Sequence, residues 1–306
     1  MLTGLSENNV KKPEWLKKTV RLNNSNINQV KDLLANLKLN TVCQSAKCPN
    51  IFECFSKKTA TFMLMGNICT RNCAFCGVRS GKPQNLDEFE PKNIAKAVKE
   101  MGLTYIVLTS VTRDDLEDGG AKHFAKTVRE IKITDPNLKV ECLIPDFKGS
   151  KKNLKILLDV KPDVLNHNLE TIKRNYKTVR DHASYNKSLD ILKNSKDLNP
   201  EVLTKSGFML GLGEEIEEIL DLLHDLESTN CDIVTIGQYL QPSKENYPVQ
   251  KYYSGEEFEK IKNLASSFNF KSVVAGIFVR SSYEAASIIN EINNTQANPK
   301  AWNFAY

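Results

Sequence analysis

From about residue 59, short runs of apolar and β-branched residues alternate with segments whose apolar residues recur at helical spacing. The short runs predict strands at 59–65, 104–110, 138–145, 163–167, 202–210 and 233–237. The amphipathic segments predict helices near 91–101, 119–132, 151–159, 185–197, 214–229 and 255–267. Six strand and helix units in succession imply a parallel sheet, because each helix returns the chain to begin the next strand in the same direction.

The predicted fold is an α/β partial barrel of the (β/α)6 type, because crossovers are right-handed and consecutive strands lie side by side. Catalytic side chains are then expected at the carboxyl ends of the strands. Polar residues and glycines do follow the predicted strands: Cys69, Cys73, Cys76, Arg113, Asp114, Asp115, Asn166, His167, Asn168, Glu170, Gly211, Gly213, Glu214 and Gln238. Each alone could serve a turn or a helix cap, but their shared position predicts one functional face.

Six of the eight cysteines form two triplets. The triplets are Cys43, Cys48 and Cys54, and then Cys69, Cys73 and Cys76. Three thiols within eight residues beside a strand would make an unusual core, so we interpret them as metal ligands. A cubane iron-sulfur cluster normally has four thiolate ligands, so each triplet would leave one iron for another ligand. The two isolated cysteines, Cys142 and Cys231, lie in strand-like runs and are predicted core residues.

His167 follows a predicted strand and is the one histidine in a position typical of an active site. A single histidine at a strand end is more often a hydrogen-bonded structural residue than a metal ligand, and we predict the structural role. The other histidines, at positions 123, 182 and 224, lack ligand spacing.

The composition is typical of a globular enzyme, with 306 residues, 41% hydrophobic and 26% charged. No apolar run approaches the roughly 18 residues that would span a bilayer. The first twenty residues contain Glu7, Pro13 and Glu14 and resemble neither a signal peptide nor a transit peptide. We therefore expect a cytoplasmic protein without a membrane partner, whose thiols stay reduced.

The net charge of +5 is concentrated near the start of the chain. Residues 1–58 carry ten Lys and Arg against four acidic residues, a balance of +6. Such a basic arm could bind nucleic acid, a membrane surface or an acidic protein, or could simply be a solvated surface. The arm has no zinc-finger spacing and no basic stripe interleaved with aromatic residues, so we predict no nucleic-acid partner.

The second triplet has the form C-x3-C-x2-C and follows the first predicted barrel strand. It resembles the motif of the radical S-adenosylmethionine superfamily. The resemblance implies that Cys69, Cys73 and Cys76 hold a 4Fe-4S cluster whose free iron binds S-adenosylmethionine. An electron from the cluster would cleave this cofactor to give a radical that abstracts hydrogen from unactivated carbon.

The first triplet has the form C-x4-C-x5-C and resembles the signature of the lipoyl synthase family. The segment Arg280-Ser-Ser-Tyr283 is similar to that family's RSSY motif, and three further blocks at 113–120, 166–171 and 235–243 also resemble it. The resemblance implies a second, auxiliary 4Fe-4S cluster held by the first triplet and by a serine oxygen. We favour Ser282 over Ser281, because alternation along an extended segment would put Ser282 and Arg280 on one face.

The resemblance implies insertion of two sulfur atoms at C6 and C8 of an octanoyl chain that is amide-linked to a lysine. The expected substrates are octanoylated lipoyl carriers, namely lipoyl domains of 2-oxoacid dehydrogenases and the glycine cleavage H protein. The auxiliary cluster would be dismantled as the sulfur source. A serine oxygen is a poorer ligand than a thiolate in a sulfur-rich cluster, so the iron that it holds should leave first. A flavodoxin or ferredoxin is the expected reductant, and we expect a monomer.

The resemblance also suggests cofactor contacts and a division of the chain. Asn168, Glu170 and Arg180 are candidates for binding S-adenosylmethionine, with Gly119 and Gly120 allowing close backbone approach; Arg180 could equally be a helix-surface residue. Residues 1–58 form an N-terminal extension carrying the auxiliary cluster ligands, 59–270 the partial barrel, and 271–306 a C-terminal extension with the RSSY motif.

Departures from the family pattern are few, and rival functions remain. Phe55, Asn246 and Ile277 stand where the family usually has Trp, His and Pro. A biotin synthase-like sulfur inserter is one alternative, although the first triplet and the serine motif argue against it. An iron-sulfur electron-transfer protein is the other, although the usual ferredoxin cysteine run is absent and electron transfer needs no barrel.

Overall fold

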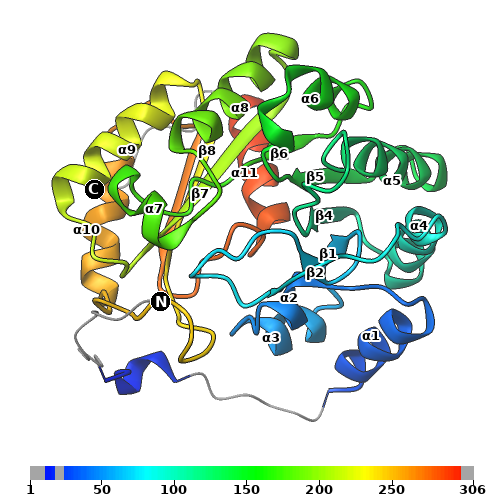
Figure 1. Ribbon diagram of the computed structural model, residues 1–306, viewed down its shortest axis with the longest axis horizontal. Coiled ribbons are helices and arrows are strands. Elements are labelled where there is room, and N and C mark those ends of the chain that lie inside the picture. The colour runs from blue at the N-terminus through cyan, green and yellow to red at the C-terminus, as the bar shows by residue number, and fades with distance from the viewer. Residues whose placement is uncertain (1–10, 18–23, 298–306) are drawn as a thin grey trace.

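The computed structural model describes residues 11–17 and 24–297, and Figure 1 gives the arrangement of the elements. Its centre is a seven-stranded sheet in the order β1-β4-β5-β6-β7-β8-β9, with every neighbouring pair parallel. The strands are β1 Thr61–Leu64, β4 Tyr105–Ser110, β5 Lys139–Leu143, β6 Val164–Asn166, β7 Leu203–Leu210, β8 Ile233–Gln238 and β9 Ser272–Gly276. The order begins at β1 and ends at β9, so the sheet is a partial barrel, as the sequence predicts.

Helices cover the outside of the sheet (Figure 1). They are α4 Glu90–Met101, α5 Ala121–Thr134, α6 Lys151–Leu158, α8 Tyr185–Leu198, α9 Ile216–Ser228 and α10 Gly255–Ala265. All six predicted strands and all six predicted helices are present, with ends that differ by a few residues. Strand β9 is an addition to the six predicted units, and it pairs with β8 from Ile233↔Ser272 to Gly237↔Gly276.

The N-terminal segment contains η1 Glu14–Leu16, α1 Ser25–Asn36, α2 Val42–Ser45 and α3 Ile51–Ser56. Thr41 pairs with Phe62 of β1 in an isolated antiparallel bridge. Buried Val30 and Leu34 of α1 and Phe55 of α3 belong to the same hydrophobic core as β1. Cys43 and Cys54 of the first triplet are therefore carried by helices that share a core with the first barrel strand, and Cys48 lies in the turn between those helices.

The last helix, α11 Ala285–Ala297, is drawn in red in the middle of the ring of strands in Figure 1 and packs against the amino ends of the strands. Its residues Ile288, Ile289 and Ile292 form a hydrophobic cluster with Val164 and Ile233, the first residues of β6 and β8. Burying this apolar stripe removes it from water and blocks the amino ends of the strands. The carboxyl ends of the strands, which the predicted strand-end residues follow, are left uncovered by this helix.

Short elements shape the loops at the carboxyl ends. They are β2 Ile68–Cys69, β3 Arg79–Ser80, η2 Phe147–Gly149, η3 Lys173–Asn175 and α7 Tyr176–Val179. Strands β2 and β3 pair in parallel through Cys69 and Ser80, which ties together the two ends of the second cysteine loop. Within the described residues, no helix is long and apolar enough to cross a membrane.

Candidate active site

The second cysteine loop leaves the carboxyl end of β1 and surrounds its sulfurs with backbone donors. The amides of Arg71 and Thr112 donate to Cys69 Sγ over 3.4 and 3.3 Å, and the amide of Val78 donates to Cys76 Sγ over 3.4 Å. Hydrogen bonds to ligand sulfurs are one of the means by which proteins set the potential of an iron-sulfur cluster. The loop is therefore suited to holding charged thiolates.

Arg71, which lies between Cys69 and Cys73, anchors this loop to two neighbouring strands. Its guanidinium donates two hydrogen bonds to Asp114 after β4, both 2.8 Å, and two to Asp146 after β5, of 2.8 and 2.9 Å. Burial alone would raise the pKa of Asp146, but the hydrogen bonds and charge of Arg71 outweigh it and hold that pKa below its usual value. Both carboxylates stay ionised and the loop is fixed in place.

Asn246 closes the other side of the loop. Its Nδ2 donates to the carbonyl oxygens of Ala74 and Cys76 over 3.0 and 2.9 Å, and the amide of Tyr247 donates to the same Ala74 oxygen over 2.8 Å. Asn246 is one of the departures from the family pattern, and its amide satisfies carbonyls inside the cysteine loop without introducing a titrating group.

Four of the six thiols in the two triplets bind their protons more tightly than a free cysteine does. Burial raises the pKa of Cys43 and of Cys73 to about 11, and that of Cys54 and of Cys76 to about 12. Iron displaces such protons when it binds, because only the thiolate is a ligand. These four thiols are thus suited to a cationic cluster that compensates the charge of the thiolates.

Three candidate cofactor residues meet beside this loop, at the ends of β6 and α7. Asn168 Nδ2 donates to Glu170 Oε1 over 3.0 Å, and Arg180 donates to Tyr176 Oη and Ser188 Oγ over 2.9 and 3.0 Å. Burial raises the pKa of Glu170 and of Cys73, and the Arg180 charge opposes both rises. Arg180 is thus half-buried near Glu170 and Cys73, and its contact with a cofactor stays a prediction.

Buried polar atoms without a partner also point to a ligand here. Among the described residues, Asn168 Oδ1, His167 Nε2 and Ser110 Oγ are buried and make no hydrogen bond. Leaving such groups unpaired costs free energy, so they fit a site that a polar cofactor completes. S-adenosylmethionine has amino, carboxylate, hydroxyl and adenine groups that could bond to these atoms.

One ring nitrogen of His167 makes the structural hydrogen bond that is predicted for this residue. Its Nδ1 bonds to the carbonyl oxygen of Ile144 over 2.9 Å, and the side chain is fully buried. Burial, with the charge of Arg180 adding, lowers the pKa of His167 to about 4. The imidazole is therefore neutral near pH 7 and packs the end of β6 against that of β5.

Gly119 and Gly120 precede α5 with positive φ values of 61° and 93°. A Cβ at Gly120 would come within 2.4 Å of Met65 Sδ, and one at Gly119 within 3.2 Å of Phe147 Cα. The close neighbours of both glycines are thus Met65 and Phe147. Contact of Gly119 and Gly120 with a cofactor stays a prediction.

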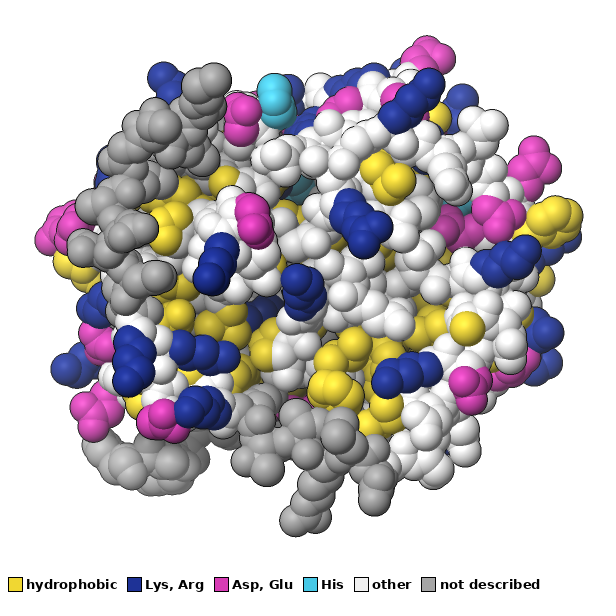
Figure 2. Space-filling view, turned by 60° about the horizontal axis from the view of Figure 1, so that its bottom comes forward, with side chains coloured by type: hydrophobic (Ala, Val, Ile, Leu, Met, Phe, Trp, Pro, Cys, Tyr) yellow, Lys and Arg dark blue, Asp and Glu magenta, His cyan; other side chains and the backbone are white. Residues whose placement is uncertain are grey.

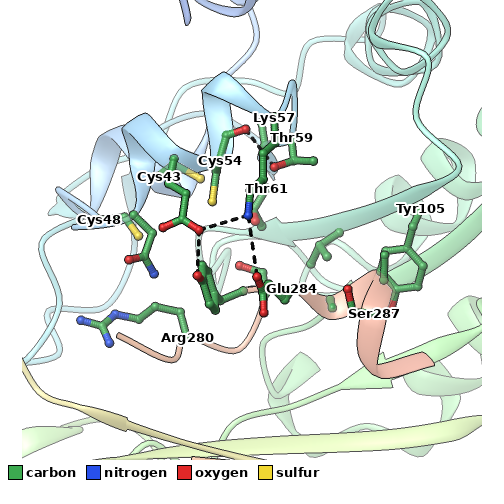
Figure 3. Close-up of a pocket in the computed structure, with 18 of the residues that line it drawn as sticks. Cys43, Cys48, Cys54, Lys57, Thr59, Thr61, Tyr105, Arg280, Glu284 and Ser287 are labelled. Atoms are coloured by element: carbon green, nitrogen blue, oxygen red, sulfur yellow. Dashed lines mark hydrogen bonds and ion pairs between the residues drawn. The ribbon is translucent and has the colours of Figure 1, made fainter. Parts of the chain in front are cut away.

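The first triplet lines a separate pocket of about 230 Å³ (Figure 3). Cys43 from α2, Cys48 from the following turn and Cys54 from α3 line it together with Arg280 and Ser282. Thr61, Tyr105 and Val107 of β1 and β4 form part of its wall. The pocket therefore joins three pieces of chain that are far apart in sequence.

The two serines of the RSSY segment lie in different surroundings. Ser282 lines the cysteine pocket, whereas Ser281 Oγ accepts a 2.7 Å hydrogen bond from Asn168 Nδ2. Residues 281–284 form a turn, in which the amide of Tyr283 donates to the carbonyl oxygen of Arg280 over 2.9 Å. The expected extended conformation is wrong, although Arg280 and Ser282 do line one pocket.

Two hydrogen bonds fasten this C-terminal segment to the residues between Cys48 and Cys54. Asn50 Nδ2 donates to the carbonyl oxygen of Phe278 over 2.7 Å, and Tyr283 Oη donates to Glu53 Oε1 over 2.8 Å. Asn50 is 1% exposed, so its bond is shielded from water. The bonds hold Ser282 beside the thiols.

The described residues contain no group of three or more His, Cys, Asp and Glu side chains that could hold a single metal ion. In a cubane cluster each thiolate binds its own iron, so the thiolates need not converge on one point. The two cysteine segments do approach each other, because a Cβ at Gly77 would come within 3.3 Å of Ala46 Cα. A side chain at position 77 would push them apart.

Four residues that support the two cysteine segments were not predicted from the sequence as site residues. Arg71, Asn50 and Glu53 all lie between cysteines of a triplet, and that position was an available signal. Asp146 follows the third predicted strand and fits the same strand-end rule as the residues that were found.

Comparison with known proteins gives the class first. Residues 63–226 match the Radical SAM superfamily. The structure of HydG, an FeFe-hydrogenase maturase, aligns with a TM-score of 0.55 at 14% identity, over 87% of this chain and 74% of that one. Methylornithine synthase PylB aligns with a TM-score of 0.50 at 15% identity, over 89% and 93%. These structures share the fold, and the chain is a member of the radical SAM superfamily.

Curated relatives narrow the class further. Lipoyl synthase from Caldicellulosiruptor saccharolyticus is 54% identical over 90% of this chain and 96% of its own length. The Aquifex aeolicus enzyme is 52% identical over 85% and 95%, and that of Neisseria meningitidis serogroup A is 50% identical over 90% and 84%. The chain belongs to the lipoyl synthase family, which confirms the resemblance seen in its motifs.

Proposed function

We propose that this chain inserts two sulfur atoms, at C6 and C8, into an octanoyl group carried on a lysine of a lipoyl carrier protein. The observation that carries the proposal is the pocket lined by Cys43, Cys48, Cys54 and Ser282, beside a separate C-x3-C-x2-C loop at the barrel mouth. One cluster would suffice for hydrogen abstraction, and a second set of iron ligands supports a sulfur donor.

The cofactors are S-adenosylmethionine and two 4Fe-4S clusters. Cys69, Cys73 and Cys76 would hold the first cluster, and the first triplet with Ser282 would hold the auxiliary one. When bound, these groups supply the radical that removes hydrogen from unactivated carbon and the sulfur that replaces it. The chain itself supplies thiolates, shields them from water and holds both cysteine segments against the barrel.

The residues around the first loop suit an amino-acid cofactor. Arg180 offers a positive charge to a carboxylate, Glu170 a negative charge to an amino group or sulfonium, and Asn168 Oδ1 an unused acceptor. Gly119 and Gly120 complete the proposed set at the start of α5. Ser282 as the auxiliary ligand is supported by its pocket, because Ser281 is hydrogen-bonded to Asn168.

The proposed partners are octanoylated lipoyl domains and the glycine cleavage H protein, with a flavodoxin or ferredoxin as electron donor. Lys11, Lys12 and Lys17 of the basic arm are exposed, although Lys17 pairs with Glu14 over 2.6 Å. Residues 1–10 and 18–23 of the arm lie outside the described part of the chain. Figure 2 displays Lys and Arg side chains spread around hydrophobic ones on the face that carries the N-terminal helices. We expect a cytoplasmic monomer, with 1–58 and 271–306 as extensions of the 59–270 barrel.

The test separates the two triplets. Cys73→Ala should abolish reductive cleavage of S-adenosylmethionine, whereas Cys48→Ala should keep cleavage but form no lipoyl product. After anaerobic reconstitution with iron and sulfide, 5′-deoxyadenosine and the lipoylated carrier are measured by mass spectrometry. Cys142→Ala, a change at a buried core cysteine, is the matched control and should keep both activities. Sulfur insertion by the Cys48 variant would refute the auxiliary-cluster role.

A further inference from the structure

The C-terminal segment reaches the barrel mouth through space left by two strand glycines. A Cβ at Gly237 of β8 would come within 2.2 Å of the carbonyl oxygen of Val279. A Cβ at Gly207 of β7 would come within 2.5 Å of Thr235 Oγ1 on β8, 3.1 Å of Asn168 Oδ1 and 3.2 Å of Ser281 Oγ. Glycine inside a strand often marks such close approach of another backbone. The segment carrying the two serines is thus packed onto the strands at this point.

Asn168 joins this segment to the candidate cofactor residues. Its Nδ2 donates one hydrogen to Glu170 Oε1 over 3.0 Å and the other to Ser281 Oγ over 2.7 Å. An amide nitrogen has only two hydrogens, so both are used. Its Oδ1 is buried and makes no hydrogen bond among the described residues. The amide is held on one side only, and a ligand that bonds to Oδ1 would fix it fully.

Ser281 and Ser282 are neighbours in one turn but face different groups. The turn is closed by the bond from Tyr283 N to Arg280 O and is held on its far side by the bond from Tyr283 Oη to Glu53. A shift of Ser281 therefore moves Ser282, because the turn has few remaining degrees of freedom. The route from Glu170 through Asn168 and Ser281 to Ser282 is continuous through hydrogen bonds and adjacent backbone.

We propose that Ser281 is a positioning residue, which couples occupancy of the S-adenosylmethionine site to the serine ligand of the auxiliary cluster. This inference rests on the proposed function. When a donor group of the cofactor bonds to Asn168 Oδ1, the amide is fixed, the bond to Ser281 is held, and Ser282 stays directed into the cysteine pocket. The auxiliary cluster is then completed most firmly when the radical source is present.

Coupling of this kind is reciprocal, so it can be measured from either site. If S-adenosylmethionine stabilises ligation by Ser282, then the assembled auxiliary cluster must tighten binding of S-adenosylmethionine by the same factor. A single buried neutral hydrogen bond corresponds to about a fivefold change in affinity. We therefore expect about fivefold tighter binding when the auxiliary cluster is present than when it is absent.

The experiment is a thermodynamic cycle on reconstituted enzyme. The Kd of S-adenosylmethionine is measured by anaerobic equilibrium dialysis for the wild-type enzyme and for Ser281→Ala, each with an intact first triplet and with its three cysteines changed to alanine. The ratio of the two Kd values should be about five in the wild-type background and close to one in the Ser281→Ala background. Ser281→Thr keeps the hydroxyl and should restore the ratio.

A spectroscopic readout separates coupling from simple loss of structure. Mössbauer spectra of the auxiliary cluster should change when S-adenosylmethionine is added to the wild-type enzyme, and should not change in Ser281→Ala. If Ser281→Ala does not fold, Ser281→Gly, which also lacks the hydroxyl, is measured in its place. Equal ratios in the two backgrounds, or no coupling in the wild-type enzyme, would overturn the inference.

The iron content distinguishes failure of the inference from failure of the proposed function. Two 4Fe-4S clusters correspond to about eight irons per chain, and loss of the first triplet should remove about four. If the triplet variant keeps all of its iron, the auxiliary site itself is absent. If the iron content per chain falls as expected while the Kd ratio is the same in the wild-type and Ser281→Ala backgrounds, only the coupling is refuted.

Discussion

Replacement of Arg71 by methionine should destabilise the protein strongly, although Arg71 is neither a predicted ligand nor a predicted cofactor residue. Its side chain is 10% exposed and those of its two partners, Asp114 and Asp146, are 36% and 4% exposed. Methionine is similar in length but donates no hydrogen bond, so it leaves both carboxylates without their cation. The buried Asp146 should determine the effect.

The magnitude follows from the burial of each partner. Removing one member of a buried ion pair costs roughly 3–5 kcal/mol, because the other charge is left uncompensated. Asp146 keeps a 3.0 Å hydrogen bond from the amide of Lys148, so the lower end, about 3 kcal/mol, is expected. The half-exposed Asp114 adds no more than about 1 kcal/mol, since water screens it. At roughly 2 °C per kcal/mol for a chain of this size, Tm should fall by about 6–8 °C.

The difference in stability between the wild-type protein and Arg71→Met should depend on pH. The wild-type pKa of Asp146 lies below its usual value, so its stabilising effect is present above the unfolded pKa of about 3.9 and is lost as the pH falls through the folded pKa. In Arg71→Met, burial raises the same pKa above that of the unfolded chain. The difference in stability between the two proteins should therefore be largest near pH 7 and shrink toward pH 4.

The assay is thermal unfolding followed by circular dichroism, on anaerobically reconstituted enzyme at pH 5 and pH 7.5. The double variant Arg71→Met/Asp146→Asn should recover most of the loss, because the buried charge is then absent. A Tm within 1 °C of the wild-type value, or a double variant less stable than the single one, would refute the reasoning.

Three further predictions concern ligation, titration and docking. Ser282→Cys should retain the auxiliary cluster more firmly and suppress sulfur insertion, because a thiolate is a better ligand than a hydroxyl for that iron. Retention is measured as the rate of iron release to a chelator. An unchanged product yield, together with an inactive Ser281→Ala variant, would identify Ser281 as the ligand. Burial lowers the pKa of His167 to about 4, so the wild-type protein should lose up to roughly 3 kcal/mol of stability as the pH falls from 6.5 to 4, and urea unfolding of His167→Gln should lack this part of the slope. Neutralising four of the lysines of the arm together should raise KM for an acidic octanoylated carrier at low salt but barely change KM for an octanoyl-lysine peptide, and equal losses on both would contradict electrostatic steering. These four are Lys11, Lys12, Lys17 and Lys18.

The barrel could be predicted because its strands and helices repeat a local pattern. Each predicted strand is an apolar run, and each predicted helix has one apolar face, so single-chain periodicity is sufficient. Strand β9, Ser272–Gly276, has half-buried residues throughout and is defined chiefly by its pairing with β8, which is a tertiary feature. Helix α11 has a short apolar stripe, Ile288, Ile289 and Ile292, followed by an asparagine-rich stretch that hides its periodicity.

The candidate ligands could be predicted because metal chemistry restricts residue type and spacing, whereas their supports could not. Arg71 and Asp146 are 75 positions apart, and nothing local to either residue indicates the other. The choice between Ser281 and Ser282 depends on a turn at 281–284, and a turn changes which neighbours face the same side. Alternation on an extended segment was the wrong premise, even though Ser282 does line the cysteine pocket.

The approach of the two cysteine segments to each other, and of the serine segment to the strands, depends on positions where a side chain is missing. Gly77 lets the two cysteine segments touch, and Gly207 and Gly237 admit the segment with the serines. At Gly237 the nearest atom is a backbone oxygen at 2.2 Å, which cannot rotate away as a flexible side chain could. Any larger residue there must displace the serine segment from the strands. Backbone packing at these glycines therefore fixes how far apart the ligand segments lie, and with it the distance between the two proposed clusters.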